Sequence, residues 1–200
     1  MENQKGRGAG GQVAEEPLRS AGEIEVALRE LNTTDSEQAR QWRNYPEIWR
    51  WCRQNDFISD LQQRDWFQRQ HQDPTIRMYG VTAANNEGKH VLVGVCGLTD
   101  IDFANSRAEF SLYIAPPLQR KGIGRAALTA LLTHGFDNLG LNQIWGEVFA
   151  ENRAGNLFES LGFKVDGKRR QYYFKDGKRI DTTLISMLSS EFVLWSATKL

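Results

Sequence analysis

Apolar and polar residues alternate over residues 24–31, which is typical of a strand buried on one face, and six further segments also read as strands. The predicted strands cover residues 24–31, 78–83, 91–101, 107–114, 144–149, 168–174 and 180–188. Asn85-Asn86-Glu87-Gly88 joins the second and third strands, and Lys175-Asp176-Gly177-Lys178 joins the last two. Both connections consist of turn-forming residues, so we expect two hairpins.

Apolar residues spaced three and four positions apart predict helices between these strands. The clearest helix runs from Ile123 to about Leu139, and Gly140 is placed to end it. Its buried face would carry Ala127, Leu128, Leu131, Leu132 and Phe136. Shorter helices are expected over residues 35–42, 46–52, 59–70 and 153–161. Asp35 with Gln38 and Ser59 with Gln62 have capping-box spacing, so each pair predicts a helix start.

The length of 200 residues suits a single domain with a substantial core. Residues 1–22 are rich in glycine and lack periodicity, which predicts a disordered N-terminal tail. The folded domain is then expected over residues 23–189. Residues 190–200 would form a C-terminal tail, whose Phe192, Leu194 and Trp195 could pack onto the body or onto a partner.

Charge and cysteine content exclude several classes of protein. Lysine plus arginine and aspartate plus glutamate both number 25, so no net charge attracts nucleic acid or an anionic membrane. No apolar run reaches the roughly 18–20 residues that span a bilayer, and no signal peptide is visible, so we expect a cytoplasmic protein. Cys52 and Cys96 lie far apart and the three histidines are scattered, so no metal site is expected. Four basic residues lie together near the sixth strand, which indicates a solvated strand edge more than a nucleic-acid site: Lys164, Lys168, Arg169 and Arg170.

A glycine-containing basic loop joins the strand at residues 107–114 to the long helix. Pro116 and Pro117 end the strand, and Gly122 and Gly124 lie where the helix begins. The first turn of a helix leaves backbone N–H groups unpaired, and the helix dipole adds positive charge there. The loop therefore predicts a site for an anion such as a phosphate or pyrophosphate, the alternative being a simple turn into a core helix.

The segment Gln119-Arg120-Lys121-Gly122-Ile123-Gly124 resembles the Gln/Arg-x-x-Gly-x-Gly/Ala motif of the GNAT superfamily of N-acetyltransferases. Residues 151–163 resemble a second motif of that superfamily. Residues 42–47 and 108–114 are similar to segments of two of its groups, the ribosomal-protein N-terminal acetyltransferases and the amino-sugar N-acetyltransferases. The resemblance implies an α/β fold whose mixed sheet of about seven strands splays in the middle and packs with about four helices.

The same resemblance implies acetyl-CoA as cosubstrate, without a metal. Its pantetheine arm would lie in a gap between residues 107–114 and 144–149, where backbone amides near Tyr113 and Ile114 would polarise the thioester carbonyl. The cofactor-binding residues implied are Tyr113, Ile114, Gln119, Arg120, Lys121, Gly122, Ile123, Gly124, Arg125, Asn152 and Phe158.

Two glutamates are candidates for the catalytic base, because a carboxylate within an apolar strand needs a partner or a cleft. Glu109 is the first candidate and Glu147 the second. The alternative for either residue is a salt bridge to Arg107 or Arg153, or exposure on one face of the sheet.

The position of the residue that protonates the departing thiolate in many family members differs in this sequence. Phe158 stands where many members have a tyrosine, and Asn152 is one position away from the usual asparagine, which Glu151 replaces. Ala154 stands where the ribosomal-protein group has a serine. Water, Tyr113, Tyr172 or Tyr173 could substitute, or no acid is needed.

Three functions remain open from the sequence. The first is direct acetyl transfer to a primary amine, with a nucleotide-linked amino sugar or other small molecule ahead of a protein N-terminus as acceptor. The second is a non-catalytic acyl-CoA-binding module, which the phenylalanine keeps open. The third, nucleic-acid binding through the basic strand edge, is the weakest. A homodimer is a possible assembly.

Overall fold

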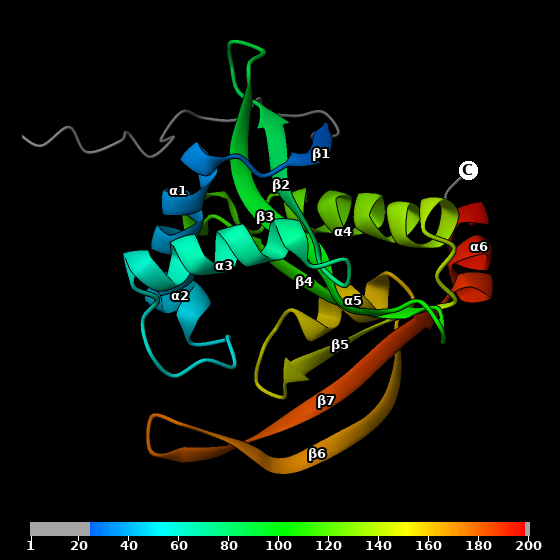
Figure 1. Ribbon diagram of the computed structural model, residues 1–200. Helices are drawn as coiled ribbons and strands as arrows, with labels where there is room; N and C mark the ends of the chain where they lie inside the picture. The colour runs from blue at the N-terminus through cyan, green and yellow to red at the C-terminus, as the bar shows by residue number, and fades with distance from the viewer. Residues whose placement is uncertain (1–24, 199–200) are drawn as a thin grey trace, which may run out of the picture.

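The computed structural model describes residues 25–198, which form a seven-stranded sheet in the order β1-β2-β3-β4-β5-β7-β6 (Figure 1). The strands are β1 Val26–Glu30, β2 Arg77–Ala84, β3 His90–Asp102, β4 Arg107–Ile114, β5 Gln143–Phe149, β6 Lys164–Lys175 and β7 Lys178–Leu188. All neighbours are antiparallel except β4 and β5, which run parallel. The expected fold class, a mixed sheet of about seven strands, is confirmed.

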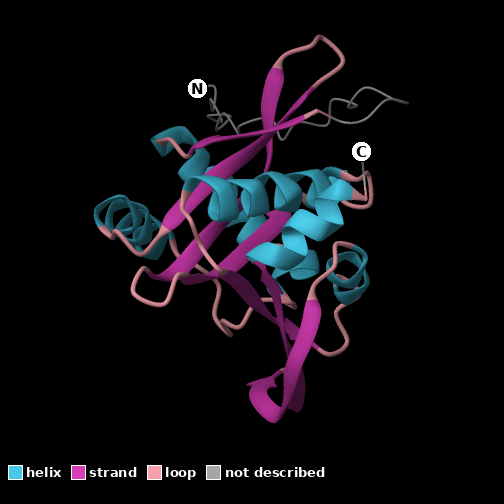
Figure 2. Cartoon of the chain, turned by 90° about the vertical axis from the view of Figure 1, so that its right-hand side faces the viewer, coloured by secondary structure: helices cyan, strands magenta, loops and turns pink. Residues whose placement is uncertain are grey.

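Helices cover both faces of the sheet (Figure 2). The α-helices are α1 Thr33–Asn44, α2 Pro46–Trp49, α3 Asp60–Gln72, α4 Ile123–Thr133, α5 Gly155–Ser160 and α6 Ser189–Ala197. A short 3-10 helix, η1 (Pro116–Leu118), precedes α4, and a π-helical turn, η2 (His134–Asn138), follows it. Helices α1 and α3 contact β3 and β2, whereas α4 contacts β1, β3 and β4. The core therefore has a layer on each side of the sheet.

The larger core layer contains the apolar face expected for α4. Ala127, Leu128, Leu131 and Leu132 are completely buried there. On the other face, Ala39 of α1 and Phe67 of α3 pack with Met78 and Val95 of the sheet.

The sheet opens between β4 and β5. These strands pair over only three positions, and the last pair is Glu109 with Trp145. At the next position, the ring of Phe110 occupies the space beside Gly146, where an added Cβ would lie 2.4 Å from the phenylalanine Cε1. Beyond it, β4 stays paired with β3 to Ile114, and β5 stays paired with β7 to Phe149. Each strand keeps its outer neighbour while the two separate, which is the splay expected from the resemblance.

The start of α1 differs from the prediction. Asn32, not Asp35, is the N-cap, and its side chain accepts a hydrogen bond from the Asp35 N–H at 3.1 Å. Asp35 returns the bond by accepting from the Asn32 N–H at 2.8 Å. Asp35 therefore belongs to a capping box as its third helical residue, so the N-cap lies three residues earlier than predicted. The second predicted capping box, Ser59 with Gln62, is confirmed at the start of α3.

The C-terminal end of the predicted domain continues into a helix. The expected tail at residues 1–22 lies outside the described residues. Residues 190–200 were expected as a C-terminal tail, but α6 occupies this segment through Ala197. Its Phe192 is buried and packs on Phe136, with ring centroids 5.2 Å apart. Phe192 thus joins the core and Trp195 packs against it, whereas Leu194 is exposed.

The predicted long helix changes character after Thr133. Leu139 N–H bonds to the His134 carbonyl, which is the five-residue spacing of a π-turn. Gly135 lies in this turn, and a Cβ there would be 2.5 Å from Ile144 of β5. A side chain at this position would therefore have to displace the end of the Ile144 side chain. Gly140 then ends the helix with a φ of +65°, as expected.

Candidate active site

The loop before α4 presents unpaired backbone donors at its helix end. The first hydrogen bond of α4 joins the Ala126 N–H to the Gly122 carbonyl, so the N–H groups of Ile123, Gly124 and Arg125 have no acceptor within the helix. Gly122 is the N-cap, with φ +84°, and no atom lies within 4 Å of its Cβ position. Backbone donors on an open surface at a helix N-terminus suit an anion.

The charged side chains around this loop have different surroundings. Arg120 and Lys121 are exposed beside the unpaired amides. Arg125 instead donates to the Ser160 hydroxyl at 2.5 Å and so connects α4 with α5. Gln119 turns back to β4 and donates to the Ile114 carbonyl at 3.0 Å. Two cations are therefore available to a bound anion, while Gln119 and Arg125 hold the loop between β4 and α5.

Gly124 lies where the loop meets the open end of the splay. A Cβ at this position would lie 3.7 Å from Ile114 of β4 and 3.8 Å from Leu157 of α5. These are ordinary contact distances, so the first turn of α4 approaches both elements closely. The expected cofactor-binding residues from Tyr113 to Arg125 therefore lie along one continuous path, from the end of β4 to the start of α4.

The two expected cofactor residues near α5 have local structural roles. Phe158 is buried and its ring packs edge-on against Phe110, with centroids 5.1 Å apart. Phe163 joins the same cluster at 5.2 Å from Phe110. Asn152 begins the turn before α5, where its side-chain oxygen accepts from the Ala154 N–H at 3.0 Å. Phe158 thus lines the core behind the splay and offers no group that can give a proton.

Both candidate glutamates face the opposite side of the sheet from Phe110. Glu109 lies in the last pair before β4 and β5 separate, and Glu147 is two residues farther along β5. The side chains are only 4% and 1% exposed. The structure therefore brings together two buried carboxylates at the start of the gap.

Arginines, a tyrosine and a threonine bind these carboxylates. Arg53, from the segment after α2, hydrogen-bonds to Glu109 and lies 3.9 Å from Glu147. Glu147 also accepts from Arg169 and Tyr173, both at 3.2 Å, and from Thr182 at 2.5 Å.

The sequence offered a salt bridge to Arg107 or Arg153 as the alternative role of each glutamate. Both glutamates do form salt bridges, but with other arginines. Arg107 pairs with Asp102 at 3.3 Å, and neither glutamate pairs with it or with Arg153 in the part of the chain described. Arg53 and Arg169 take that place because the chain folds their distant segments over the carboxylates.

Burial raises the pKa of the Glu109 carboxyl above its ordinary value, because the charged form is poorly solvated. The Arg53 guanidinium opposes this shift, whereas Asp100 and Glu147 add to it. Burial also raises the pKa of Tyr173, and the neighbouring Glu147 carboxylate contributes. A carboxylate with a raised pKa accepts a proton from an ammonium group more readily than an ordinary one.

Sequence reasoning missed Arg53 altogether. It lies in an irregular segment, 56 residues before Glu109, and belongs to no motif. Of the three tyrosines considered as proton donors, Tyr173 is the one bonded to a site carboxylate. Tyr113 packs under Arg43, with the guanidinium carbon 5.6 Å from the ring centroid, and Tyr172 packs under Arg169 at 4.7 Å.

The basic residues of β6 are largely paired. Lys164 binds Glu191 at 2.6 Å and Lys168 binds Asp181 at 2.7 Å, while Arg169 turns toward the site. Their charges are thus partly neutralised by neighbouring carboxylates, as on an ordinary strand edge.

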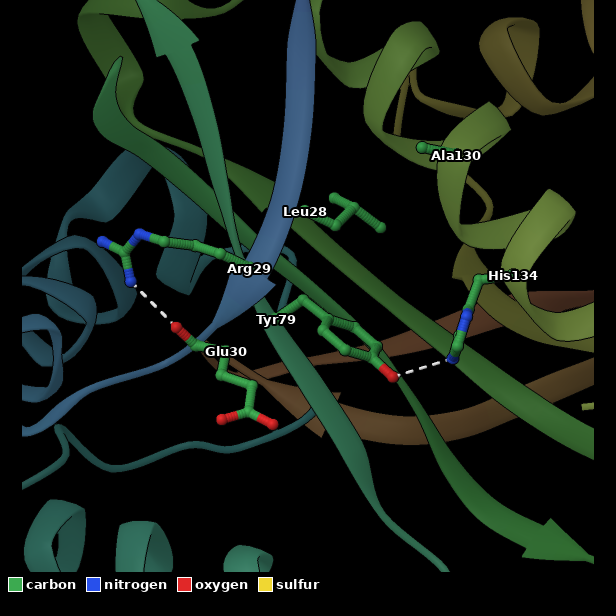
Figure 3. A pocket seen from close by; sticks show the side chains of 6 residues that line it. All are labelled: Leu28, Arg29, Glu30, Tyr79, Ala130 and His134. Atoms are coloured by element: carbon green, nitrogen blue, oxygen red, sulfur yellow. Dashed lines mark hydrogen bonds between the residues drawn. The ribbon is translucent and has the colours of Figure 1, made fainter. Parts of the chain in front are cut away.

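A separate hollow of about 340 Å³ lies between β1, β2 and α4 (Figure 3). Tyr79 and His134 point toward each other across it, with the hydroxyl oxygen 2.9 Å from Nε2. Burial lowers the pKa of His134, which favours the neutral ring as the partner of the tyrosine hydroxyl. None of the residues expected for the active site lines this hollow.

Residues 25–198 contain no group of three or more histidine, cysteine, aspartate or glutamate side chains that could hold a metal ion. None of the helices described is both long and apolar enough to cross a membrane.

Comparison with known proteins identifies the family. Residues 25–164 match the model of the acetyltransferase (GNAT) domain. An uncharacterised N-acetyltransferase, p20 of Bacillus licheniformis, is 27% identical over 84% of this chain and 94% of its own length. The spermidine N(1)-acetyltransferase of Vibrio cholerae is 26% identical over 84% of this chain and 96% of its own.

Solved structures agree with this assignment. The crystal structure of the Vibrio cholerae spermidine N-acetyltransferase, in complex with CoA and spermine, superposes with a TM-score of 0.77. It is 25% identical, and the match covers 84% of this chain and 98% of that one. The splayed sheet, the glycine loop and these matches lead to one conclusion: the chain belongs to the GNAT acetyltransferase family and is an acyltransferase.

Proposed function

We propose that the protein transfers an acetyl group from acetyl-CoA directly to a primary amine of a small molecule that also carries an anionic group. The observation that carries the transfer step is the end of β4–β5 pairing at Glu109 and Trp145. It opens a gap with a helix N-terminus at one end and two buried carboxylates at the other.

The residues around the loop fit the cosubstrate. The free amides of Ile123, Gly124 and Arg125, with exposed Arg120 and Lys121, would hold its pyrophosphate. The pantetheine arm would follow the unpaired edge of β4, since alternate residues of an antiparallel strand direct their backbone groups away from the paired neighbour. When bound, acetyl-CoA supplies the activated acetyl group.

The chain's own contribution is to orient and deprotonate the acceptor amine. An amine is mostly protonated at neutral pH, so its nitrogen needs a base before it can attack. Glu109 lies at the start of the gap and has a raised pKa, which suits it as that base. Glu147 and Tyr173, joined by a hydrogen bond of 3.2 Å, would receive or relay a proton beside it.

The preferred charge of the acceptor follows from which charged side chains are exposed at the site. Both carboxylates are almost completely buried under arginines, whereas Arg53 is 46% and Arg169 is 38% exposed. An entering molecule therefore meets guanidinium groups first. Guanidinium binds carboxylate and phosphate in a bidentate manner, so an amine with such a group nearby fits better than a polycation. A nucleotide-linked amino sugar meets this description.

A polyamine is the second candidate, because of the similarity to spermidine N-acetyltransferases. For a polycation to bind, Arg53 and Arg169 would have to leave the carboxylates. A protein N-terminus is a third acceptor, and it needs an acidic residue close behind the amine to satisfy the same arginines.

The test is release of free thiol from acetyl-CoA with matched acceptors: a nucleotide-linked amino sugar, the same sugar without its nucleotide, spermidine, and peptides with acidic or neutral second residues. We expect the nucleotide-linked sugar to exceed the free sugar at least about tenfold in kcat/KM, which corresponds to one well-formed charged contact. Arg169→Gln should reduce that ratio more than it reduces the rate with the free sugar.

Other results would refute separate parts of the proposal. A preference for spermidine would refute the proposal that the acceptor carries an anionic group, but it would support acetyl transfer to an amine. If no acceptor of a broad panel causes thiol release while CoA still raises the melting temperature, the non-catalytic module is favoured. No thermal shift with CoA would remove the cofactor assignment itself.

A further inference from the structure

Lys175 is a buried lysine at the tip of the β6–β7 hairpin, only 4% exposed. Its ammonium donates to three backbone carbonyls, those of Trp49 at 2.7 Å, Cys52 at 2.7 Å and Gln54 at 2.8 Å. It also lies 4.0 Å from the centroid of the Trp49 ring. An ammonium group has three donors, so all of them are used.

The three carbonyls belong to one segment, which runs from the end of α2 to just beyond Arg53. This segment is 121–126 residues away from Lys175 in the sequence. The last carbonyls of a helix lack intrahelical partners, and the irregular residues after it have no ladder to join. The Trp49 carbonyl also accepts from the Cys52 N–H at 3.0 Å, so the lysine is a second donor to that oxygen. The carbonyls of Cys52 and Gln54 lie in irregular backbone, and the same ammonium group binds both of them.

Arg53 lies between two of the carbonyls that Lys175 binds, those of Cys52 and Gln54. The backbone of Arg53 is thus held on both sides by one ammonium group. Its side chain then reaches Glu109 and Glu147. Figure 1 shows the β6–β7 hairpin reaching from the far end of the sheet toward the side on which α2 lies.

We propose that Lys175 is a positioning residue for the active site: it fixes the backbone around Arg53 so that the guanidinium stays on the two carboxylates. This inference rests on the proposed function of Glu109 as the base. The β6–β7 hairpin then serves two purposes, because its strands supply Arg169 and Tyr173 to Glu147 while its tip sets the position of Arg53.

The charged groups near the two ends of this connection are known. Arg53, Asp100 and Glu147 act on Glu109, and Cys52, Asp176 and Arg43 act on Lys175. Loss of the Arg53 contact removes the cation that opposes the effect of burial on the Glu109 carboxyl, so its protonated form is favoured.

The experiment compares Lys175→Met, Arg53→Met and the double variant, with kcat/KM measured against pH. Both single variants should shift the acidic limb of the profile to higher pH by about one unit. This shift is at the lower end of what a neighbouring charge causes, because Arg53 is half exposed. The double variant should show no further movement, because the two residues act on Glu109 through one contact. Lys178→Met, at the exposed residue opposite Lys175 in the turn, is the matched control and should leave the limb unchanged.

A structural role alone predicts a different pattern. Lys175→Met would then lower the melting temperature and the active fraction but leave the acidic limb in place, which would overturn the proposal. Lys175→Arg should restore the limb, because it keeps a cation with several donors. If Lys175→Met does not fold, Lys175→Gln, which keeps two donors, should give a smaller upward movement, and no movement would again overturn the proposal.

Failure of the base assignment is recognisable separately. If Glu109→Gln keeps full activity at all pH values, Glu109 is not the base, whatever the lysine variants do. The position of Arg53 can still be followed then. Hydrogen exchange of the amides at residues 50–54 should be at least about tenfold faster in Lys175→Met than in Lys178→Met, and equal rates would overturn the positioning role.

Discussion

Gly146→Ala tests the physical basis of the splay. The added methyl group would lie 2.4, 2.8 and 3.0 Å from three carbons of the Phe110 ring, whereas carbon atoms in good contact are about 3.5–4.0 Å apart. The ring would have to move by about 1 Å to restore normal contact. Phe158 and Phe163 pack against it at 5.1 and 5.2 Å between centroids, so no free space receives it.

The expected loss of stability is that of an overpacked core. Such substitutions cost about 1–3 kcal/mol. Alanine also reduces the conformational freedom of the unfolded chain, which offsets about 0.5 kcal/mol. The net loss of about 0.5–2.5 kcal/mol corresponds, at about 3 °C per kcal/mol, to a melting temperature about 2–8 °C lower for a domain of this size.

Thermal denaturation is the assay, with Gly167→Ala as the matched control. Gly167 is also a strand glycine, but no atom lies within 4 Å of its Cβ position, so alanine should be neutral or slightly stabilising. Phe110→Leu should cost less in the Gly146→Ala background than alone, with a coupling of about 1 kcal/mol. Equal stability of the two alanine variants would refute the conclusion that the Phe110 ring fills the space beside Gly146 between β4 and β5.

Three further predictions concern the site and the cysteines. Glu109→Gln should lower kcat/KM about 10²–10⁴-fold without changing the thermal shift with CoA. It should also remove the acidic limb of the pH profile, because activity falls as pH drops through the raised pKa of the Glu109 carboxyl. An unchanged limb would contradict this. Gly124→Asp should abolish the thermal shift with CoA, whereas Gly124→Ala, whose methyl meets only ordinary contacts at 3.7 and 3.8 Å, should keep most of it. Burial raises the pKa of the Cys96 thiol to about 12, so a thiol reagent should modify at most Cys52 in the native protein and both cysteines after unfolding; two fast-reacting thiols in the native state would be the contrary result.

Much of the fold could be predicted from the sequence because its signals are local. Residues 107–114 were predicted as a strand and form β4, and the turn residues Asp176 and Gly177 adopt the positive φ values that a tight hairpin needs. The start of α1 was misassigned because Asp35 is both a good N-cap and a good third residue of a capping box. Only the surrounding backbone distinguishes these roles.

The C-terminal segment was underestimated for a different reason. Residues 190–200 have no strong periodicity, and whether Phe192 is buried depends on Phe136 being beside it. Tertiary packing, not local propensity, makes that segment a helix.

The sequence by itself indicated the family and predicted an anion site, since the loop from Gln119 to Gly124 is contiguous and its amides are arranged by one helix start. Only the tertiary structure decided the surroundings of the carboxylates. Arg53 and Glu109 are separated by 56 residues, and Lys175 lies 121–126 residues from the carbonyls it binds. A charge buried in a strand requires a partner, but electrostatics does not specify which part of the chain supplies it. The fold brings these distant residues together, and that choice determines the charge that an acceptor meets.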